Sequence, residues 1–259
     1  YIIFGTKWDE TQNGEYLLFK LDSELNLVWQ KTYGGSLHEE ASNMISTTDG
    51  GFLLVGTSDS ADGDITNNIG GNDLWLVKTD TQGKLEWEKS YGGSNDEYYG
   101  KIFLAENGYL LISSSDSSDG NVGGNNGSSD FWIVKISENG DMEWEKHFGG
   151  SDYEVPVSAL VTPSQEYIIA GYSNSTDGDI SDSRGNFDFW ILKLNSGGEL
   201  IWEKSLGGNN VDKPMGIIHD HEDGYLVFGN SNAWNGDITA PLGQNDGWVV
   251  KLNDEGNVV

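Results

Sequence analysis

The feature that most constrains the fold of this chain is a repeat of about 58 residues that runs through its whole length. Three markers keep one register: a Trp, a Gly-Gly pair, and an Asp two residues before another Trp. Their members are Trp29, Trp87, Trp144 and Trp202; Gly34-Gly35, Gly92-Gly93, Gly149-Gly150 and Gly207-Gly208; and Asp73, Asp130, Asp188 and Asp246. Repeats of this kind bury their apolar faces against one another, so we expect a repeat architecture.

Each unit predicts four short β-strands joined in sequence. In the unit 36–93, Asp49-Gly50 is a tight hairpin signal, and the apolar run after it is suited to a buried strand. The composition agrees, with 36 Gly, 10 Trp, 11 Tyr, 9 Phe and only 4 Pro. The expected strands of this unit are 41–47, 52–57, 74–79 and 85–88. Four antiparallel strands in sequence make a meander, the usual blade of a β-propeller.

We therefore expect an all-β chain that forms a β-propeller with four-stranded antiparallel blades, five in number, as a single domain over 1–259. The first copy lacks its innermost strand, and the last copy ends just before its outer Trp. A fragment of a six- to eight-bladed ring and a stacked solenoid are the competing architectures. The expected units are 1–35 (partial), 36–93, 94–150, 151–208 and 209–259 (partial).

The net charge of the chain limits the classes of partner that it can bind. A formal net charge of −28 argues against nucleic acid and against anionic membrane surfaces, because both would repel it. No apolar run is long enough for a membrane span, so we expect no direct membrane insertion. The chain has no Cys, which fits either redox compartment. Any signal peptide is expected to be removed or to lie outside this sequence.

The repeat resembles that of secreted and surface-anchored proteins of Bacteroidetes-type bacteria. The resemblance covers essentially the whole chain and implies a propeller-like domain on an exported, extracellular or cell-surface protein; it implies no activity. The first unit departs from the pattern, because Lys7 to Glu15 replaces the long loop and has no Asp-Gly-Asp. The matching motifs are Asp49-Gly50-Gly51-Phe52, Gly56-Thr57-Ser58, Asp62-Gly63-Asp64, Asp73-Leu74-Trp75-Leu76-Val77-Lys78 and Trp87-Glu88-Lys89.

The Asp-rich loop of each unit is the candidate metal site. Its oxygens are closely spaced around a glycine, which suits Ca²⁺, although the spacing is not that of an EF-hand. The alternative is that Asp-Gly marks a turn in which Asp and Asn side chains bond the nearby backbone. The Asp before each Trp is expected instead to be a buried hydrogen-bond acceptor between strands. The candidate calcium ligands are Asp59, Asp62, Asp64, Asp116, Asp119, Asn121, Asp177, Asp179 and Asp237.

Two Trp residues fall outside the periodic positions. Trp8 and Trp234 belong to loops on the acidic face, and they would come together if five blades close the ring. Exposed aromatic rings beside Asp and Asn are typical of sugar-binding sites, so both are candidate ligand-binding residues. The alternative is an apolar patch that only covers the junction between the first and last blades. The other eight Trp are expected to pack as core.

A second candidate cluster is His219-Asp220-His221-Glu222, which has the residue types of a metal or acid–base site. It aligns with Ser46 to Asp49, a hairpin tip on the opposite face, so a solvated turn is the competing interpretation.

From these patterns we expect a protein that is not an enzyme. It would be an extracellular interaction or scaffold module that binds a protein or glycan partner on its acidic loop face. This expectation rests on the near identity of the loops, since catalysis needs one asymmetric constellation. The alternative is a carbohydrate-active enzyme or lectin with a site in the central channel or at the junction of the first and fifth blades. A structural spacer without any ligand is the third possibility.

Overall fold

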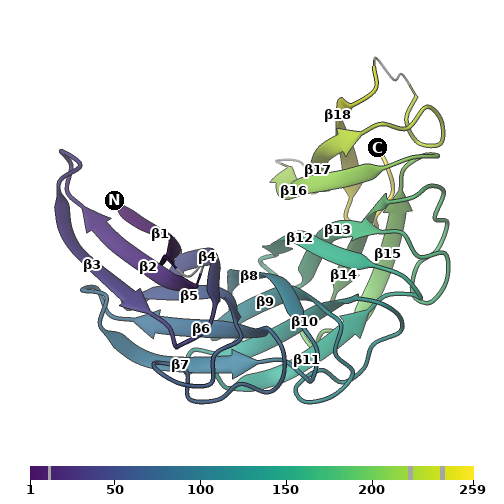
Figure 1. The fold of residues 1–259 in the computed structure, drawn as a ribbon. Helices are drawn as coiled ribbons and strands as arrows, with labels where there is room; N and C mark the ends of the chain where they lie inside the picture. Colours follow the sequence, from purple (N-terminus) through teal and green to yellow (C-terminus); the bar gives the residue numbers. More distant parts are fainter. Residues whose placement is uncertain (11–12, 221–223, 240–242) are drawn as a thin grey trace. The chain divides into compact units, whose positions relative to one another are not determined.

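The structure of the chain is a computed structural model that describes residues 1–10, 13–220, 224–239 and 243–259. These residues form eighteen β-strands and no helix, arranged as five sheets in sequence order (Figure 1). No helix that could cross a membrane occurs in the described part of the chain. The prediction of an all-β chain with four-stranded antiparallel sheets is confirmed.

Each sheet is a meander in which consecutive strands pair. The first sheet contains β1 (Ile2–Trp8), β2 (Gly14–Leu21) and β3 (Leu27–Tyr33). The second contains β4 (Glu39–Ser46), β5 (Phe52–Ser58), β6 (Asp73–Thr79) and β7 (Leu85–Tyr91). The third contains β8 (Glu97–Ala105), β9 (Gly108–Ser115), β10 (Asp130–Ser137) and β11 (Met142–Phe148). The fourth contains β12 (Glu154–Val161), β13 (Tyr167–Ser173), β14 (Asp188–Leu194) and β15 (Leu200–Leu206), and the fifth contains β16 (Asp212–Asp220), β17 (Gly224–Ser231) and β18 (Asp246–Asn253).

The chain divides into two compact units. Unit 1 comprises residues 1–124 and 134–143, and unit 2 comprises 125–133 and 144–259, so the strands of the third sheet belong to both. The five-bladed ring and the single domain over 1–259 stay predictions.

The central strands of the complete sheets form the core. Every residue of β6 is buried, from Asp73 to Thr79, because both faces of this strand are covered. In unit 1 the ring of Tyr16 packs 4.7 Å from that of Trp75, and its hydroxyl donates to the carbonyl oxygen of Trp75 at 3.0 Å. The buried Trp75 indole donates to Glu88 of the outer strand at 2.9 Å. The periodic Trp of this strand is therefore core, as expected.

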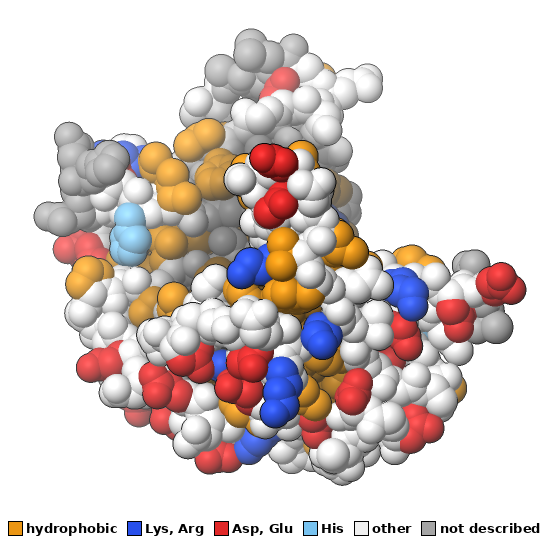
Figure 2. Space-filling model, turned by 90° about the vertical axis from the view of Figure 1, so that its left-hand side faces the viewer, with side chains coloured by type: hydrophobic (Ala, Val, Ile, Leu, Met, Phe, Trp, Pro, Cys, Tyr) orange, Lys and Arg blue, Asp and Glu red, His pale blue; other side chains and the backbone are white. Residues whose placement is uncertain are grey.

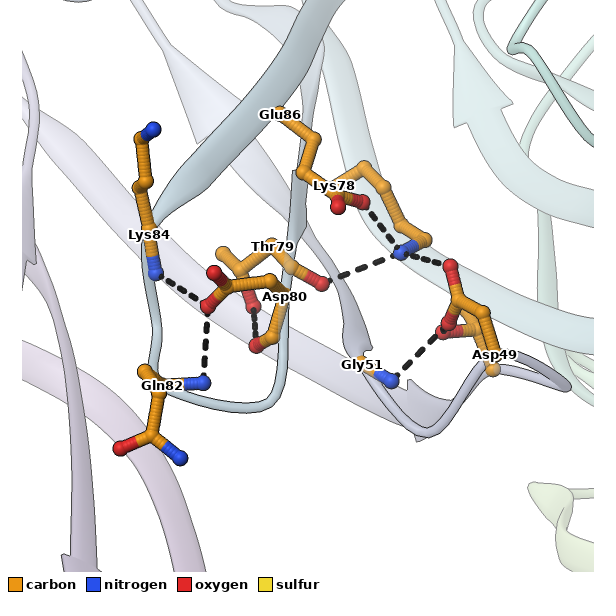
Figure 3. A network of polar contacts seen from close by, with 9 residues as sticks. Asp49, Gly51, Lys78, Thr79, Asp80, Gln82, Lys84 and Glu86 are labelled. Atoms are coloured by element: carbon orange, nitrogen blue, oxygen red, sulfur yellow. Dashed lines mark hydrogen bonds and ion pairs between the residues drawn. The ribbon is translucent and has the colours of Figure 1, made fainter.

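One end of the second sheet is held by a buried lysine (Figure 3). Lys78 Nζ donates to Asp49 at 2.7 Å, to Glu86 at 2.8 Å and to the carbonyl oxygen of Thr79 at 3.0 Å. Its side chain is almost fully buried, whereas both carboxylates are about half exposed. The β6–β7 turn beside it is closed by Asp80, which accepts from two backbone N–H groups, and these bonds lower the pKa of Asp80. The buried lysines Lys135 and Lys193 occupy the same position in the next two sheets.

Candidate functional site

The Asp-rich loop of the second sheet lies against the Gly-Gly link that precedes it. Asp64 accepts from the backbone N–H of Gly34 at 3.2 Å, and Asp62 accepts from that of Ser36 at 2.7 Å. Asp59 accepts from His38 N–H at 2.6 Å. The carboxylates therefore satisfy backbone donors of an irregular segment, which would otherwise remain unpaired.

The same contacts recur in the other complete loops. In the third sheet, Asp119 accepts from Ser94 N–H at 2.7 Å and Asn121 from Gly92 N–H at 3.2 Å. Asp116 is instead the acceptor of a bond from the Tyr98 hydroxyl at 3.3 Å. In unit 2 the acceptors of link N–H groups are Asp177 at 2.8 Å, Asp179 at 3.1 Å and Asp237 at 3.1 Å.

Calcium binding by these loops stays a prediction. Eight of the nine candidate ligands accept a hydrogen bond from a backbone N–H group, and Asp116 accepts one from the Tyr98 hydroxyl. Among the described residues, no group of three or more His, Cys, Asp or Glu side chains is placed to hold a metal ion. An Asn can replace an Asp in such a bond, which explains why Asn121 stands where the second sheet has Asp64.

The Asp that precedes each core Trp is a buried acceptor, but for the loop rather than for a strand. Asp73 Oδ2 accepts from Ile69 N–H at 2.5 Å, and Asp130 and Asp188 accept in the same way from Asn126 at 2.8 Å and Arg184 at 2.6 Å. Each closes the end of its loop against the strand that follows.

One strand pair breaks the repeat. In three sheets, the second strand has a glycine at the point where the first strand of the sheet passes closest. A Cβ on this glycine would overlap with a carbonyl oxygen of the first strand; for Gly56 this is the oxygen of Glu40. The third sheet has Ser113 at this position. Its hydroxyl donates to the carbonyl oxygen of Tyr98 at 2.8 Å. The inner strands of the other three sheets have one extra residue here, and β8 in addition lacks the pair at Ser113, so its pairing with β9 is interrupted between Tyr98 and Lys101.

The interruption places Tyr99 in a left-handed conformation with φ of +59°. A bulky residue rarely adopts this conformation, because its Cβ approaches the following carbonyl oxygen. The Tyr99 side chain is 60% exposed. Irregular strand positions of this kind redirect side chains and are frequent beside binding sites.

A cavity of about 410 Å³ lies beside Tyr99 in unit 1. Its wall contains aromatic, carboxylate and amide groups, and no Lys or Arg side chain is part of the lining that the structure describes. We call it the β4–β8 cavity, and its lining includes His38, Glu40, Thr57, Asn72, Tyr98 and Tyr99.

The hydrogen-bonding groups of the cavity are fixed by their neighbours. His38 Nδ1 accepts from the backbone N–H of Gly14 at 3.0 Å, so in the neutral ring the hydrogen is on Nε2. The Tyr98 hydroxyl is 3.0 Å from Asp96 and 3.3 Å from Asp116. Burial, and then these acidic neighbours, raise the pKa of Tyr98, so it remains an uncharged donor.

The corresponding position in unit 2 is filled. There Tyr172 and Phe187 stand where unit 1 has Thr57 and Asn72. The ammonium group of Lys213 lies 4.1 Å from the centre of the Tyr172 ring and 4.2 Å from that of Phe187. These cation–π contacts join three side chains whose counterparts in unit 1, Thr57, Asn72 and Tyr98, line the β4–β8 cavity.

The two candidate Trp residues are both exposed. Trp8 is 54% exposed and its ring stacks on that of His38, with ring centres 4.9 Å apart, so it adds an aromatic surface next to the β4–β8 cavity. Trp234 is 56% exposed, lies in unit 2, and donates its backbone N–H to Asn209 at 3.1 Å. Their binding role and their meeting at a blade junction stay predictions.

Three residues of the β4–β8 cavity were not predicted from the sequence: His38, Tyr98 and Tyr99. The sequence does carry a sign of this site, because Ser113 stands where three other copies have Gly56, Gly171 and Gly229. The His219–Glu222 cluster is described only in part, since His221 and Glu222 lie outside the described residues. His219 and Asp220 line a separate cavity of about 490 Å³ in unit 2, with Glu166, Tyr225 and Asp254.

Solved structures with propeller-like folds are similar to this chain. A protein of unknown function from Bacteroides caccae has a TM-score of 0.51 at 11% identity, over 100% of this chain and 91% of that one. The phage phi92 endosialidase has a TM-score of 0.51 at 10% identity, over 97% of this chain and 47% of that one. A thermostable family-43 glycoside hydrolase has a TM-score of 0.49 at 11% identity, over 100% of this chain and 92% of that one. No protein-family model matches the chain, and no curated protein matches it.

The two similarities with a TM-score of 0.51 support the propeller fold and correct one expectation. The chain was expected not to be an enzyme because its loops are near copies of one another. That prediction is wrong, since the fold is shared with an endosialidase, and repeated architecture therefore does not exclude catalysis. The resemblance to Bacteroidetes-type repeat proteins stays a prediction.

Proposed function

We propose that this protein binds an uncharged saccharide in the β4–β8 cavity, outside the cell or at its surface. The observation that carries the proposal is the exposed, left-handed Tyr99 at the rim of a cavity found where the repeat is broken. Aromatic rings stack on the apolar faces of sugars, and nearby Glu, Asn and His side chains can exchange hydrogen bonds with sugar hydroxyls.

The charge of the site supports an uncharged ligand. Glu40 lines the cavity, and Asp96 and Asp116 lie behind Tyr98. Acidic side chains are also spread over the surface shown in Figure 2, with fewer basic ones among them. This field would repel sialic and uronic acids, so the ligand class differs from that named for the phage endosialidase. Export to the cell surface rests on the resemblance of the repeat and is part of the proposal.

The test is a screen of neutral and acidic glycans, followed by calorimetric titration of any neutral oligosaccharide that binds. Tyr99→Gly removes the ring and also relieves the left-handed strain. We expect its affinity to fall about tenfold, as for the loss of one stacked aromatic ring and its buried area. Tyr153→Ala, at a ring in unit 2 that is 51% exposed, is the control and should bind normally.

Two results would count against this proposal: a preference for acidic glycans, or equal losses in both variants. Analysis of the glycan after prolonged incubation shows in the same experiment whether it is only bound or also cleaved.

A further inference from the structure

The first glycine of the Gly-Gly link is enclosed by two carboxyl groups from neighbouring sheets. A Cβ on Gly92 would overlap with both Asp73 Oδ1 and Glu97 Oε2, so these oxygens face each other over the Gly92 Cα atom with no side chain between them. The equivalent trios in unit 2 are Gly149 with Asp130 and Glu154, and Gly207 with Asp188 and Asp212.

Both members of the pair in unit 1 are buried, Asp73 at 1% and Glu97 at 0% exposure. Glu97 accepts from the Ser115 hydroxyl at 2.7 Å and from Gly93 N–H at 3.2 Å. Asp73 Oδ2 accepts from the loop backbone, but its buried Oδ1 has no hydrogen-bond donor. The buried Oδ1 atoms of Asp130 and Asp188 likewise have no hydrogen-bond donor.

Two buried carboxylates that face each other are costly, because each loses its hydration and repels the other. The other charged group that acts on Asp73 is the carboxylate of Asp96, which adds repulsion. In unit 2, Asp179 acts on Asp130, and Asp237 acts on Asp212. The guanidinium of Arg184, near the last pair, is bonded to Asp182 and Asp237 instead. A hydrogen on one carboxyl group would remove the repulsion and give Oδ1 of the aspartate a donor.

We propose that Asp73 and Glu97 share one proton at neutral pH, and that the two pairs of unit 2 do the same. Each pair is then a proton-binding site that exists only in the folded chain. Burial, as the largest cause, raises the pKa of Glu97 and of Asp130 to about 7, and it also raises the pKa values of Asp73, Glu154, Asp188 and Asp212.

The direction of the pH dependence follows from proton uptake on folding. Unfolded Asp and Glu release their protons near pH 4, whereas the folded pairs hold theirs to about pH 7. The folded state therefore binds more protons in this interval, and the free energy of unfolding decreases as the pH rises through the folded pKa. The protein should be more stable at pH 5 than at pH 8.

The junction between the first and second sheets provides an internal comparison. Glu39 accepts from Gly35 N–H at 2.8 Å and from the Ser58 hydroxyl at 2.7 Å, as Glu97 does from its own neighbours. The residue equivalent to Asp73 in the first sheet is Glu15, which is partly exposed and forms an ion pair with Lys7 at 3.4 Å. This junction therefore lacks the opposing buried aspartate.

The test compares Tm at pH 5 and pH 8 for the whole chain and for Asp73→Asn. The amide N–H of Asn would donate permanently to Glu97 Oε2, while its oxygen keeps the bond from Ile69. We expect the Tm of Asp73→Asn at pH 8 to be at least equal to that of the unchanged protein. The decrease in Tm from pH 5 to pH 8 should be smaller by about one third, because one of the three carboxyl pairs no longer contributes to it. Asp188→Asn should have the same effect on the pH dependence of Tm.

Asp152→Asn is the control, because it removes the same charge from an exposed side chain. If it flattens the pH dependence as much as Asp73→Asn, general charge repulsion is responsible and the proposal fails. Infrared spectroscopy gives a second readout: the native protein at pH 6 should show the carbonyl band of protonated carboxyl groups, and unfolding at that pH should remove it. Absence of the band in the native protein would also overturn the proposal.

Discussion

The hydroxyl of Ser113 donates to the carbonyl oxygen of Tyr98 at 2.8 Å, at the one place where a complete copy of the repeat lacks its glycine. In the other copies a Cβ at this position would overlap with the equivalent carbonyl oxygen, so only glycine permits the regular strand pair. In the third sheet the strand pair at Ser113 itself is missing, and Tyr99 beside it takes a left-handed conformation. One substitution in the repeat thus accounts for the asymmetry of the candidate site.

Replacing this serine should remove the candidate site without unfolding the protein. Ser113→Gly allows the regular pairing, so we expect Tyr99 to leave its left-handed conformation and saccharide binding to fall about tenfold, as in the loss of the aromatic ring itself. Ser113→Ala keeps the Cβ that blocks the pair and should bind within about twofold of the unchanged protein. Titration of both variants with the same oligosaccharide measures the difference, and equal binding by both would contradict this account.

The loop carboxylates should behave as backbone acceptors. Asp64→Ala removes the acceptor of the Gly34 N–H, and we expect a loss of about 1 kcal/mol in the free energy of unfolding. Asp64→Asn keeps an acceptor oxygen, as Asn121 does in the third sheet, and should cost about half of that or less. Denaturant unfolding with and without a chelator measures both. A large loss in Asp64→Asn that disappears with chelator would instead indicate a bound cation.

The buried lysine of the second sheet should be a strong stabilising residue. Lys78→Met leaves Asp49 and Glu86 without their shared cation, and we expect a loss of about 1–3 kcal/mol, below the usual value for a buried pair because both carboxylates are half exposed. Lys20→Met is the control, since Val28 stands there in place of Glu86. Thermal or denaturant unfolding of both variants gives the comparison, and a loss as large in Lys20→Met would contradict it.

The same network predicts a loss of stability in acid. Hydrogen bonding to Lys78, and then to Thr47 and Gly51, lowers the pKa of Asp49. Its contribution is therefore present above the unfolded pKa of about 3.9 and is lost as the pH falls towards the lower folded value. Below about pH 4 the chain should lose stability, and the loss should be smaller in Lys78→Met. Unfolding curves between pH 2 and pH 5 measure it, on the acid side of the range in which the carboxyl pairs act.

A side chain on Gly92 should be poorly tolerated. The Cβ of Gly92→Ala would overlap with both carboxyl groups of the Asp73–Glu97 pair, which are buried and cannot move aside freely. We expect a loss of about 2–3 kcal/mol, as in overpacked cores. Gly5→Ala is the matched control, because nothing lies within 4 Å of its added Cβ, and it should change the free energy of unfolding by less than about 1 kcal/mol. Similar losses in the two variants would contradict the enclosed position of Gly92.

The repeat, the strands and their order could all be predicted from the sequence. Trp75 and its equivalents recur at a spacing of about 58 residues, and the period of the apolar residues around them selects strands, so both follow from local pattern. The burial of the Trp75 ring was also predictable, because a large apolar side chain that recurs in every copy is expected to be removed from water in the core.

The roles of the polar residues, in contrast, depend on contacts between segments that are distant in the sequence. Asp64 and Gly34 are 30 residues apart, and Asp73 and Glu97 are 24 apart, so their contacts depend on how one sheet meets the next link. From the sequence, a carboxylate that holds a metal ion and one that accepts a backbone N–H look the same. The conformation of Tyr99 likewise depends on a Cβ contributed from another strand, by Ser113, and local propensity contains no information about that contact.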